Sequence, residues 1–348
     1  MSKLIYEYYS PKGLKKSKNI TNSSRLVIKE AEKFGIKWSI EPGTQIVTLT
    51  YKGQEQSYYH QVPSSTTALA KYACNHKKVT SNLLRQAGVC VPHGYRVRRD
   101  QNQDYFLEVF SSLSKPLVVK PTNGYWGENI TVGIIDEKEY LDAIELAFSY
   151  SVKKNTGAIV EEMFPGQEYR ILLTREKVIG VLKRIPANVI GNGQDSISKL
   201  VKQKNKEEIR GVKGGEKSHL KIRIDKKMKA FLNEQRLSIG SILPPGEKIF
   251  LRRVSNISQG GEAIDFTDKV HPSVREIALK AIGSIPGLSF AGVDFMSLDI
   301  TKKQSDNSYV IIEINDSPGF DIHDYPYEGE NRHTAREFLF LLFPDLKK

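Results

Sequence analysis

The stretch Ala291–Arg332 constrains this chain most, because two apolar, strand-like runs within it carry polar side chains that a buried strand ordinarily avoids. Asp294 lies in AGVDFM, and Glu313 and Asn315 lie in YVIIEIN. Side chains alternate along a strand, so Glu313 and Asn315 share one face. Such oxygen donors suit Mg²⁺, which takes one or two carboxylates, keeps several waters and binds substrate phosphates. The pattern therefore predicts nucleotide chemistry beside the Asp-Ser-Pro-Gly segment that ends the second run.

Composition is typical of a globular protein outside the membrane. The chain has 348 residues, 39% hydrophobic and 26% charged, which is enough for two or three subdomains. No apolar run approaches the roughly 18 residues of a membrane span, and MSKLIYEYYS lacks the apolar core of a signal peptide. Cys74 and Cys90 fit neither a disulfide framework nor a zinc spacing. We therefore expect a cytoplasmic protein with two reduced thiols and no membrane association.

The net charge of +12 arises from 52 basic and 40 acidic residues. Basic residues are densest between Lys199 and Lys229, where the charge fits either attraction for polyanions or a solvated basic surface. No aromatic residue interrupts that stretch, although single-stranded nucleic acid is usually bound by stacking aromatics in a basic groove. This disfavours nucleic acid as the main partner.

Hydrophobic periodicity predicts alternating helices and strands. HKKVTSNLLRQAG (residues 76–88) has the spacing of an amphipathic helix. PLVVK and NITVGII read as strands around a glycine-containing loop, and YRILLT and VIGVLKRI read as a hairpin. Because the paired strands are close in sequence, we predict an α+β fold with mixed or antiparallel sheets.

The loop after Lys120 reads PTNGYWGEN. Gly124 and Gly127 free the backbone to approach a phosphate, and consecutive amides in such a loop can bind an anion. Lys120 ends an apolar strand, where an ammonium is costly to bury without a partner such as a phosphate. A plain hairpin loop with a lysine reaching solvent fits the same residues.

Two further segments carry polar groups in compact order. In VEEMFPGQEYR, Glu161, Glu162 and Glu168 can accept hydrogen bonds from an exocyclic amine or a ribose, and Arg170 can fork onto a phosphate or carboxylate. In FLRRVSNISQGGEAIDFT, Arg253, Asn256 and Ser258 with two glycines offer donors to a developing oxyanion. Solvated carboxylates at a strand end and a polar turn are the alternatives.

Taken in order, these segments resemble the ATP-grasp superfamily over about residues 77–332. Within it, RIPANVIGNGQDSI, NISQGGEAIDFT and HDYPYEGENR resemble the ATP-grasp domains of cyanophycin synthetase and of bacterial bifunctional glutamate–cysteine ligase/glutathione synthetase. The resemblance implies two α+β subdomains that grip ATP, preceded by a small N-terminal domain. We expect an N-terminal region at 1–75, a lid subdomain at 76–165 and a C-terminal subdomain at 166–348, with a basic insertion at about 186–247.

The resemblance also implies roles for individual residues. ATP would be held by Lys77, Lys120, Gly124, Gly127, Glu161, Glu162, Phe164 and Glu168. Two Mg²⁺ ions, or Mn²⁺, would be held by Asp294, Glu313 and Asn315. The reacting groups would lie near Arg253, Asn256, Ser258, Arg170, Arg184 and Lys183. His323, Glu328 and Arg332 lie at the end of the match.

The implied activity is ATP-dependent joining of a carboxylate to an amine through an acyl phosphate, with release of ADP and phosphate. The sequence carries no glutamate–cysteine ligase or Mur-ligase-like half, and NDSPG stands where related proteins have NANPG or NAGPG. The substrates are therefore not carried over: amino acids and small peptides remain alternatives, and a homo-oligomer is implied only by analogy. A ligase that modifies a ribosomal peptide or protein, using residues 1–75 as a docking element, and a non-catalytic ATP- or polyanion-binding protein are the competing hypotheses.

Overall fold

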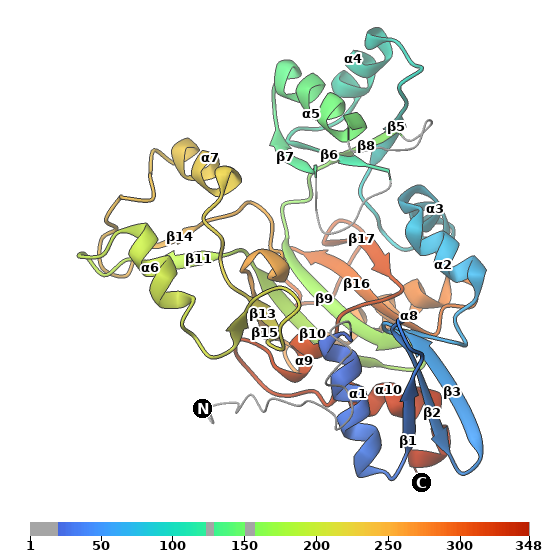
Figure 1. Ribbon diagram of the computed structural model, residues 1–348. Helices are drawn as coiled ribbons and strands as arrows, with labels where there is room; N and C mark the ends of the chain where they lie inside the picture. The colour runs from blue at the N-terminus through green and yellow to red at the C-terminus, as the bar shows by residue number, and fades with distance from the viewer. Residues whose placement is uncertain (1–19, 123–128, 150–156, 348) are drawn as a thin grey trace.

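The computed structural model describes residues 20–122, 129–149 and 157–347 (Figure 1). Its organising element is a five-stranded antiparallel sheet in the order β15-β10-β9-β16-β17. These strands are β9 (Gln167–Thr174), β10 (Val178–Ile185), β15 (Glu262–Asp265), β16 (Phe290–Ser297) and β17 (Tyr309–Asn315). The predicted hairpin is the β9–β10 pair, and both carboxylate-bearing runs are neighbouring strands of this sheet.

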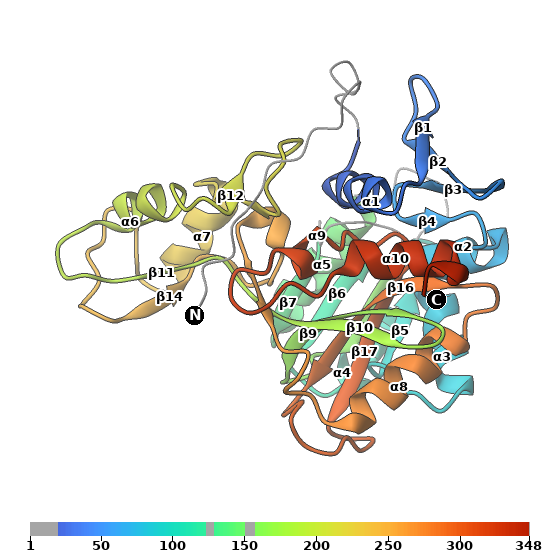
Figure 2. The same ribbon diagram turned by 90° about the horizontal axis from the view of Figure 1, so that it is seen from below.

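The two faces of the central sheet differ, and that difference places the site. Tyr169, Ile171 and Leu173 of β9 pack into a core with α8 (Pro272–Gly283), α2 (Ala68–Asn75) and α3 (Lys77–Gln86). On the opposite face of β9, Leu172 packs beneath α10 (Thr334–Leu342), which Figure 2 shows on the other side of the sheet from α8. Residues nearer the start of β9 on that face are Glu168 and Arg170, so one end of the face is apolar and the other is charged.

A second sheet is formed by strands that precede β9 in sequence. Its order is β5-β8-β6-β7, with β5 (Gly94–Val97), β6 (Leu117–Pro121), β7 (Thr131–Ile134) and β8 (Ala158–Glu162). Helices α4 (Gln103–Ser112) and α5 (Glu137–Ser149) bury one face of it around Phe106, Tyr140 and Phe148. Asn102 caps α4 by accepting from Tyr105 N at 3.0 Å, as expected for asparagine at this position.

The N-terminal region is an α-helix followed by an antiparallel meander. Helix α1 (Asn22–Lys33) begins where Thr21 accepts from Ser24 N at 3.1 Å. Strands β1 (Lys37–Ile40), β2 (Ile46–Tyr51), β3 (Gln54–Tyr59) and β4 (Val62–Pro63) follow in sequence order. Their buried side chains share one core with α10 and with the short helix η3 (Pro344–Lys347) at the other end of the chain.

The basic segment folds around a core of its own, which includes Val189, Leu200, Met228 and Ile249. It projects to one side of the central sheet (Figure 1). Its elements are β11 (Asn188–Ile190), α6 (Ile197–Lys204), β12 (Arg210–Gly211), β13 (His219–Leu220), α7 (Lys226–Glu234) and β14 (Lys248–Phe250). The predicted basic insertion is therefore a folded unit, while its exact boundaries and those near residues 75 and 165 stay predictions.

The α+β class and the antiparallel sheets are confirmed. The helix predicted at residues 76–88 is α3, and β12 and β13 form a short parallel pair outside the two larger sheets. No helix in the described ranges combines the length and apolar character that a membrane span needs.

Candidate active site

Strand register brings the polar residues of three strands to one place. Asp294 of β16 lies opposite Arg170 of β9 on one side and opposite Glu313 of β17 on the other. Directly opposed residues in a sheet share a face. The sequence therefore needs only the pairing of β9, β16 and β17 to gather these three side chains beside one another.

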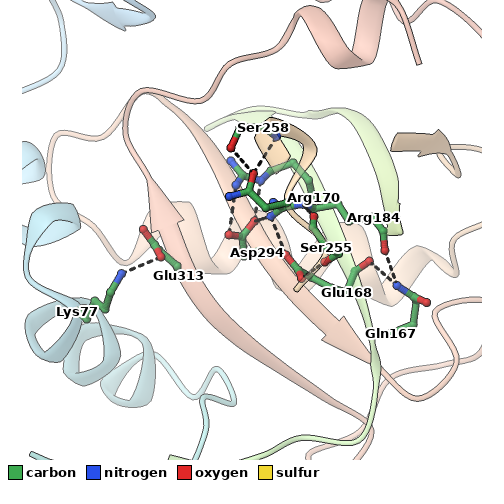
Figure 3. Close-up of polar contacts among 10 residues, drawn as sticks. Lys77, Gln167, Glu168, Arg170, Arg184, Ser255, Ser258, Asp294 and Glu313 are labelled. Carbon is green, nitrogen blue, oxygen red and sulfur yellow. Dashed lines mark hydrogen bonds and ion pairs between the residues drawn. The ribbon is translucent and has the colours of Figure 1, made fainter. Parts of the chain in front are cut away.

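Asp294 is held by two arginines (Figure 3). Arg170 Nη2 donates to Asp294 Oδ2 at 3.2 Å, and Arg170 Nε lies 2.6 Å from Oδ1. Arg184 Nη1 reaches the same Oδ1 at 3.4 Å and donates to Glu168 Oε1 at 2.6 Å. Ser255 Oγ donates to the other oxygen of Glu168. The result is a chain of charge-assisted contacts from Asp294 to the Ser255 loop, of the kind that fixes side-chain geometry.

Burial shapes the electrostatics of this chain of contacts. Removal from water raises the pKa of Glu168, and neighbouring Asp294 raises it further, against the opposing charge of Arg184. For Arg184, burial acts to lower the pKa, but Glu168, Asp294 and Glu313 together keep it above its ordinary value. Arg184 therefore stays charged beside these carboxylates.

The predicted metal ligands lie at the β17 edge of the same cluster. Lys77, the first residue of α3, donates to Glu313 Oε2 at 2.8 Å. Asn315 Oδ1 accepts from Ser317 N at 2.9 Å and so shapes the Asp-Ser-Pro-Gly turn. Among the described residues no group of three or more His, Cys, Asp or Glu side chains could hold a metal. Two carboxylates and an amide nevertheless fit Mg²⁺, which takes its remaining ligands from water and phosphate.

The second sheet contributes the predicted nucleotide contacts. Lys120 of β6 lies 2.6 Å from Glu161 of β8, and both side chains are nearly buried. The side chain of the next residue, Glu162, makes a separate contact: its Oε1 accepts a hydrogen bond from Ser114 N at 2.9 Å. The backbone N–H of Glu162 donates to His93 O at 2.9 Å and is therefore engaged within the protein. Gly124 and Gly127 lie outside the described residues.

The linker from β8 to β9 is held in a close turn. A Cβ on Gly166 would lie 2.6 Å from the ring of Phe164 and 2.7 Å from Ser297 O. Only glycine permits this approach without displacement of the chain. The ring of Phe164 thus packs against the Gly166 turn that precedes β9.

The loop before β15 presents the third group of predicted residues. Asn256 begins the short helix η2 (Ile257–Gln259), and its Oδ1 accepts from Ser258 N at 2.9 Å and Ser258 Oγ at 2.8 Å. Gly260 ends it in the left-handed region, at φ 95°. Arg253, predicted to join this group, instead pairs with Glu234 of α7 and lies 5.2 Å from the ring of Phe231.

Arg253 and Lys183 make contacts other than those the resemblance implies. Sequence reasoning also missed two residues that bond Glu168 and Arg184. Lys183 neighbours Arg184 on a strand, so the two side chains face opposite ways, and Lys183 lies over Phe266 at 5.9 Å. Ser255 and Gln167 were missed: Gln167 Nε2 bonds Arg184 O at 2.8 Å. Ser255 directly precedes Asn256, which is the one sequence signal that could have pointed to it.

The residues at the end of the resemblance lie beside the cluster. His323 is fully buried, and burial lowers its pKa to about 3. Neither ring nitrogen has a partner within the described part of the chain. Arg332 Nε bonds both carboxylate oxygens of Asp265 at 3.0 Å, and Asp265 N donates to Glu328 O at 2.8 Å. These contacts fold the C-terminal loop against β15.

The antiparallel central sheet, the second sheet over its charged end and the carboxylate pair on adjacent strands define the class of protein. The chain belongs to the ATP-grasp family, because the family model for an ATP-grasp domain matches residues 74–318. It is 36% identical over 92% of its length to the glutathione biosynthesis bifunctional protein GshAB of Clostridium perfringens. It is 33% identical over 99% of its length to cyanophycin synthetase of Geminocystis herdmanii.

A solved structure agrees with the same assignment. The crystal structure of a bifunctional glutathione synthetase from Pasteurella multocida matches 94% of this chain and 45% of its own, with a TM-score of 0.71 and 28% identity. The chain spans 41% and 39% of the two curated relatives. Since the match to cyanophycin synthetase covers nearly the whole chain, most of the N-terminal region is shared with that protein rather than particular to this one.

Proposed function

We propose that the protein is an ATP-dependent ligase that joins a carboxylate to an amine. The observation that carries this proposal is the row Arg170–Asp294–Glu313 across three strands of an ATP-grasp sheet, with Lys77 and Arg184 bonded to its carboxylates. A site with two carboxylates for a cation and several cations for anions suits transfer of a phosphoryl group, in which positioning and charge stabilisation provide most of the catalysis.

The nucleotide would lie between the two sheets. Lys77 and Lys120 would bind its phosphates from opposite sides, and Glu161, Phe164 and Glu168 would border its adenosine part. Asp294, Glu313 and Asn315 would hold Mg²⁺, which supplies charge neutralisation at the phosphate oxygens. In this proposal the ion pairs Lys77–Glu313 and Lys120–Glu161 hold each lysine ready at 2.8 and 2.6 Å from its carboxylate.

The reaction needs no nucleophile from the protein. A substrate carboxylate oxygen attacks the γ-phosphorus of ATP, the bond to ADP breaks, and an acyl phosphate forms. The amine then attacks the acyl carbon, loses a proton and expels phosphate. Arg170 and Arg184 would stabilise charge on the transferred group, and the Ser255–Ser258 loop would offer donors to the tetrahedral intermediate.

The substrates we propose are an amino acid or peptide carboxylate and an amino-acid amine. The chemistry of this site fits either a small molecule or a peptide. The hypothesis that residues 1–75 are a peptide-docking element loses support, because that region is largely shared with cyanophycin synthetase and α1 packs against α10. A pure polyanion binder is disfavoured, because it has no use for the paired carboxylates.

Mass spectrometry of a substrate screen tests the proposal. Purified protein is incubated with Mg-ATP and pooled amino acids, dipeptides and cell metabolites, with Asp294→Asn as the matched inactive control. We expect substrate-dependent ADP together with a product lighter by one water than the sum of two components. AMP in place of ADP would overturn the acyl-phosphate mechanism, and an equally active Asp294→Asn variant would overturn the site.

A further inference from the structure

Helix α1 makes a direct contact with the segment that follows the predicted metal strand. Ser23 Oγ accepts from Phe320 N at 2.9 Å and from Asp321 N at 3.3 Å, and it donates to Asp321 Oδ1 at 3.0 Å. Ser23 is 1% exposed. A hydroxyl has one proton and two lone pairs, so this side chain is completely used by three contacts across almost the whole length of the chain.

Those contacts fix the start of the short helix α9 (Asp321–Asp324), which lies on the charged face of the central sheet. Ile322 of α9 packs with Leu182 of β10 and Ala263 of β15. Leu182 is directly opposite Arg170 in the sheet. A Cβ on Gly180 would lie 2.8 Å from His323 Nδ1, so the imidazole fills the space that this glycine leaves.

The position of α9 relative to the strands indicates which part of the charged face it borders. The second sheet joins β9 at Gln167, so the proposed nucleotide side is the Glu168 end of the face. Ile322 packs against Leu182, which lies opposite Arg170, and His323 reaches Gly180, which lies opposite Leu172 on the far side of Arg170. Helix α9 therefore borders the charged face beside Arg170, next to where the transferred group is proposed to lie.

The first turn of α1 also reaches the basic insertion. Asn22 Nδ2 donates to Lys217 O at 3.1 Å, and Arg25 lies 3.8 Å from Glu216. Helix α1 thus contacts both the segment after β17 and the loop between β12 and β13. Figure 1 shows it beside α9 and α10.

We propose that Ser23 is a positioning residue: it fixes α9 beside Arg170 and so sets the binding of a substrate other than ATP. The proposal rests on the ligase function proposed above. It gives the N-terminal region a role in substrate binding, although Ser23 itself touches neither reacting group.

Two neighbouring serines allow a matched test in the full-length protein. Ser23→Ala removes the acceptor of two backbone amides, whereas Ser24→Ala removes an equally buried hydroxyl that donates to His60 O at 3.1 Å. We expect Ser23→Ala to raise KM for the carboxylate or the amine substrate about tenfold and to leave KM for Mg-ATP within about twofold. We expect Ser24→Ala to change none of these KM values. Asp321→Ala, which removes only the side-chain half of the contact, serves as a milder variant if Ser23→Ala does not fold.

Hydrogen exchange provides the second measurement, because it does not require turnover. The amides of residues 319–325 should exchange faster in Ser23→Ala than in wild type or Ser24→Ala. Equal exchange in the two variants would overturn the contact, and faster exchange with unchanged KM values for both the carboxylate and the amine would overturn its role in binding. A wild-type chain that turns over no carboxylate–amine pair would instead contradict the proposed ligase function.

Discussion

Two carboxylates of the central sheet are each flanked by two cations, yet their surroundings differ. Asp294 lies between Arg170 and Arg184 with 14% of its side chain exposed. Glu262 lies between Lys204 and Arg210 and is 4% exposed, while the Arg210 side chain is 0% exposed. A carboxylate paired with two cations thus occurs once in a partly solvent-exposed, open cluster around Asp294 and once in a buried, sealed cluster around Glu262.

The partners of the two clusters explain the difference. Arg210 also donates to Leu220 O at 3.2 Å and Gly260 O at 2.9 Å, and Asn188 donates to Glu262 at 3.0 Å. Every charge there is used to attach the basic insertion to β15. Asp294 borders Glu313, whose side chain is 33% exposed, so that cluster can exchange its internal partners for ligands. Burial separates the structural cluster from the proposed catalytic one.

The largest expected effect is on turnover, from the open cluster. Asp294→Asn and Glu313→Gln should each lower kcat about 10³-fold or more, because each removes a carboxylate proposed to hold the Mg²⁺ that neutralises the phosphate oxygens. The melting temperature should change little, since both side chains are partly solvated. Activity assays with thermal denaturation check this, and normal turnover in both variants would remove the metal assignment.

The sealed cluster should show the reverse behaviour. Arg210→Met leaves Glu262 buried with one cation fewer, which should lower the free energy of unfolding by about 3–5 kcal/mol. Urea denaturation measures this loss. A single variant as stable as wild type would show that the cluster is not the attachment we describe.

A glycine tests how closely the open cluster is packed. A Cβ on Gly292 would lie 2.7 Å from Arg170 Nη1 and 2.8 Å from Pro318 Cβ. Gly292→Ala should therefore push Arg170 away from Asp294 and reduce turnover about 10- to 100-fold. Gly283→Ala is the matched control, because nothing lies within 4 Å of a Cβ there. Equal activity of the two variants would contradict the stated role of Arg170.

A pH dependence of stability is expected from two buried histidines. Burial lowers the pKa of His219 and of His323 to about 3 from 6.5. The unfolded chain then binds more protons between these values, so stability is complete above about pH 6.5 and falls as the pH drops toward 3. Urea midpoints measured from pH 7 to 4 should fall less in His219→Gln than in wild type. An identical pH profile in the two proteins would contradict the burial of His219.

Local patterns were sufficient to predict much of this fold. The strand alternation around Glu313 and Asn315 placed both on one face, and the hairpin of β9 and β10 followed from two apolar runs with a short turn between them. Pairing of β16 with β17 then brought Asp294 beside Glu313. These predictions depend on neighbours in sequence, for which periodicity carries the information.

Long-range burial was not predictable in the same way. Lys204 and Arg210 lie in a stretch whose composition fits a solvated surface, yet both are paired with Glu262 from β15. The Arg253 side chain pairs with Glu234 of α7, a helix of the basic insertion. The contact of Ser23 with Asp321 joins the two ends of the chain. Nothing in local spacing encodes such pairings, because they depend on how distant elements pack.

Transfer of ¹⁸O from a labelled carboxylate substrate tests the central claim most directly. The substrate pair found in the screen is supplied with ¹⁸O in both carboxylate oxygens, and the released phosphate is analysed by mass spectrometry. Our account predicts ADP and phosphate that carries one ¹⁸O, because the carboxylate oxygen attacks the γ-phosphorus and leaves with it. Unlabelled phosphate, or ¹⁸O in AMP, would contradict it.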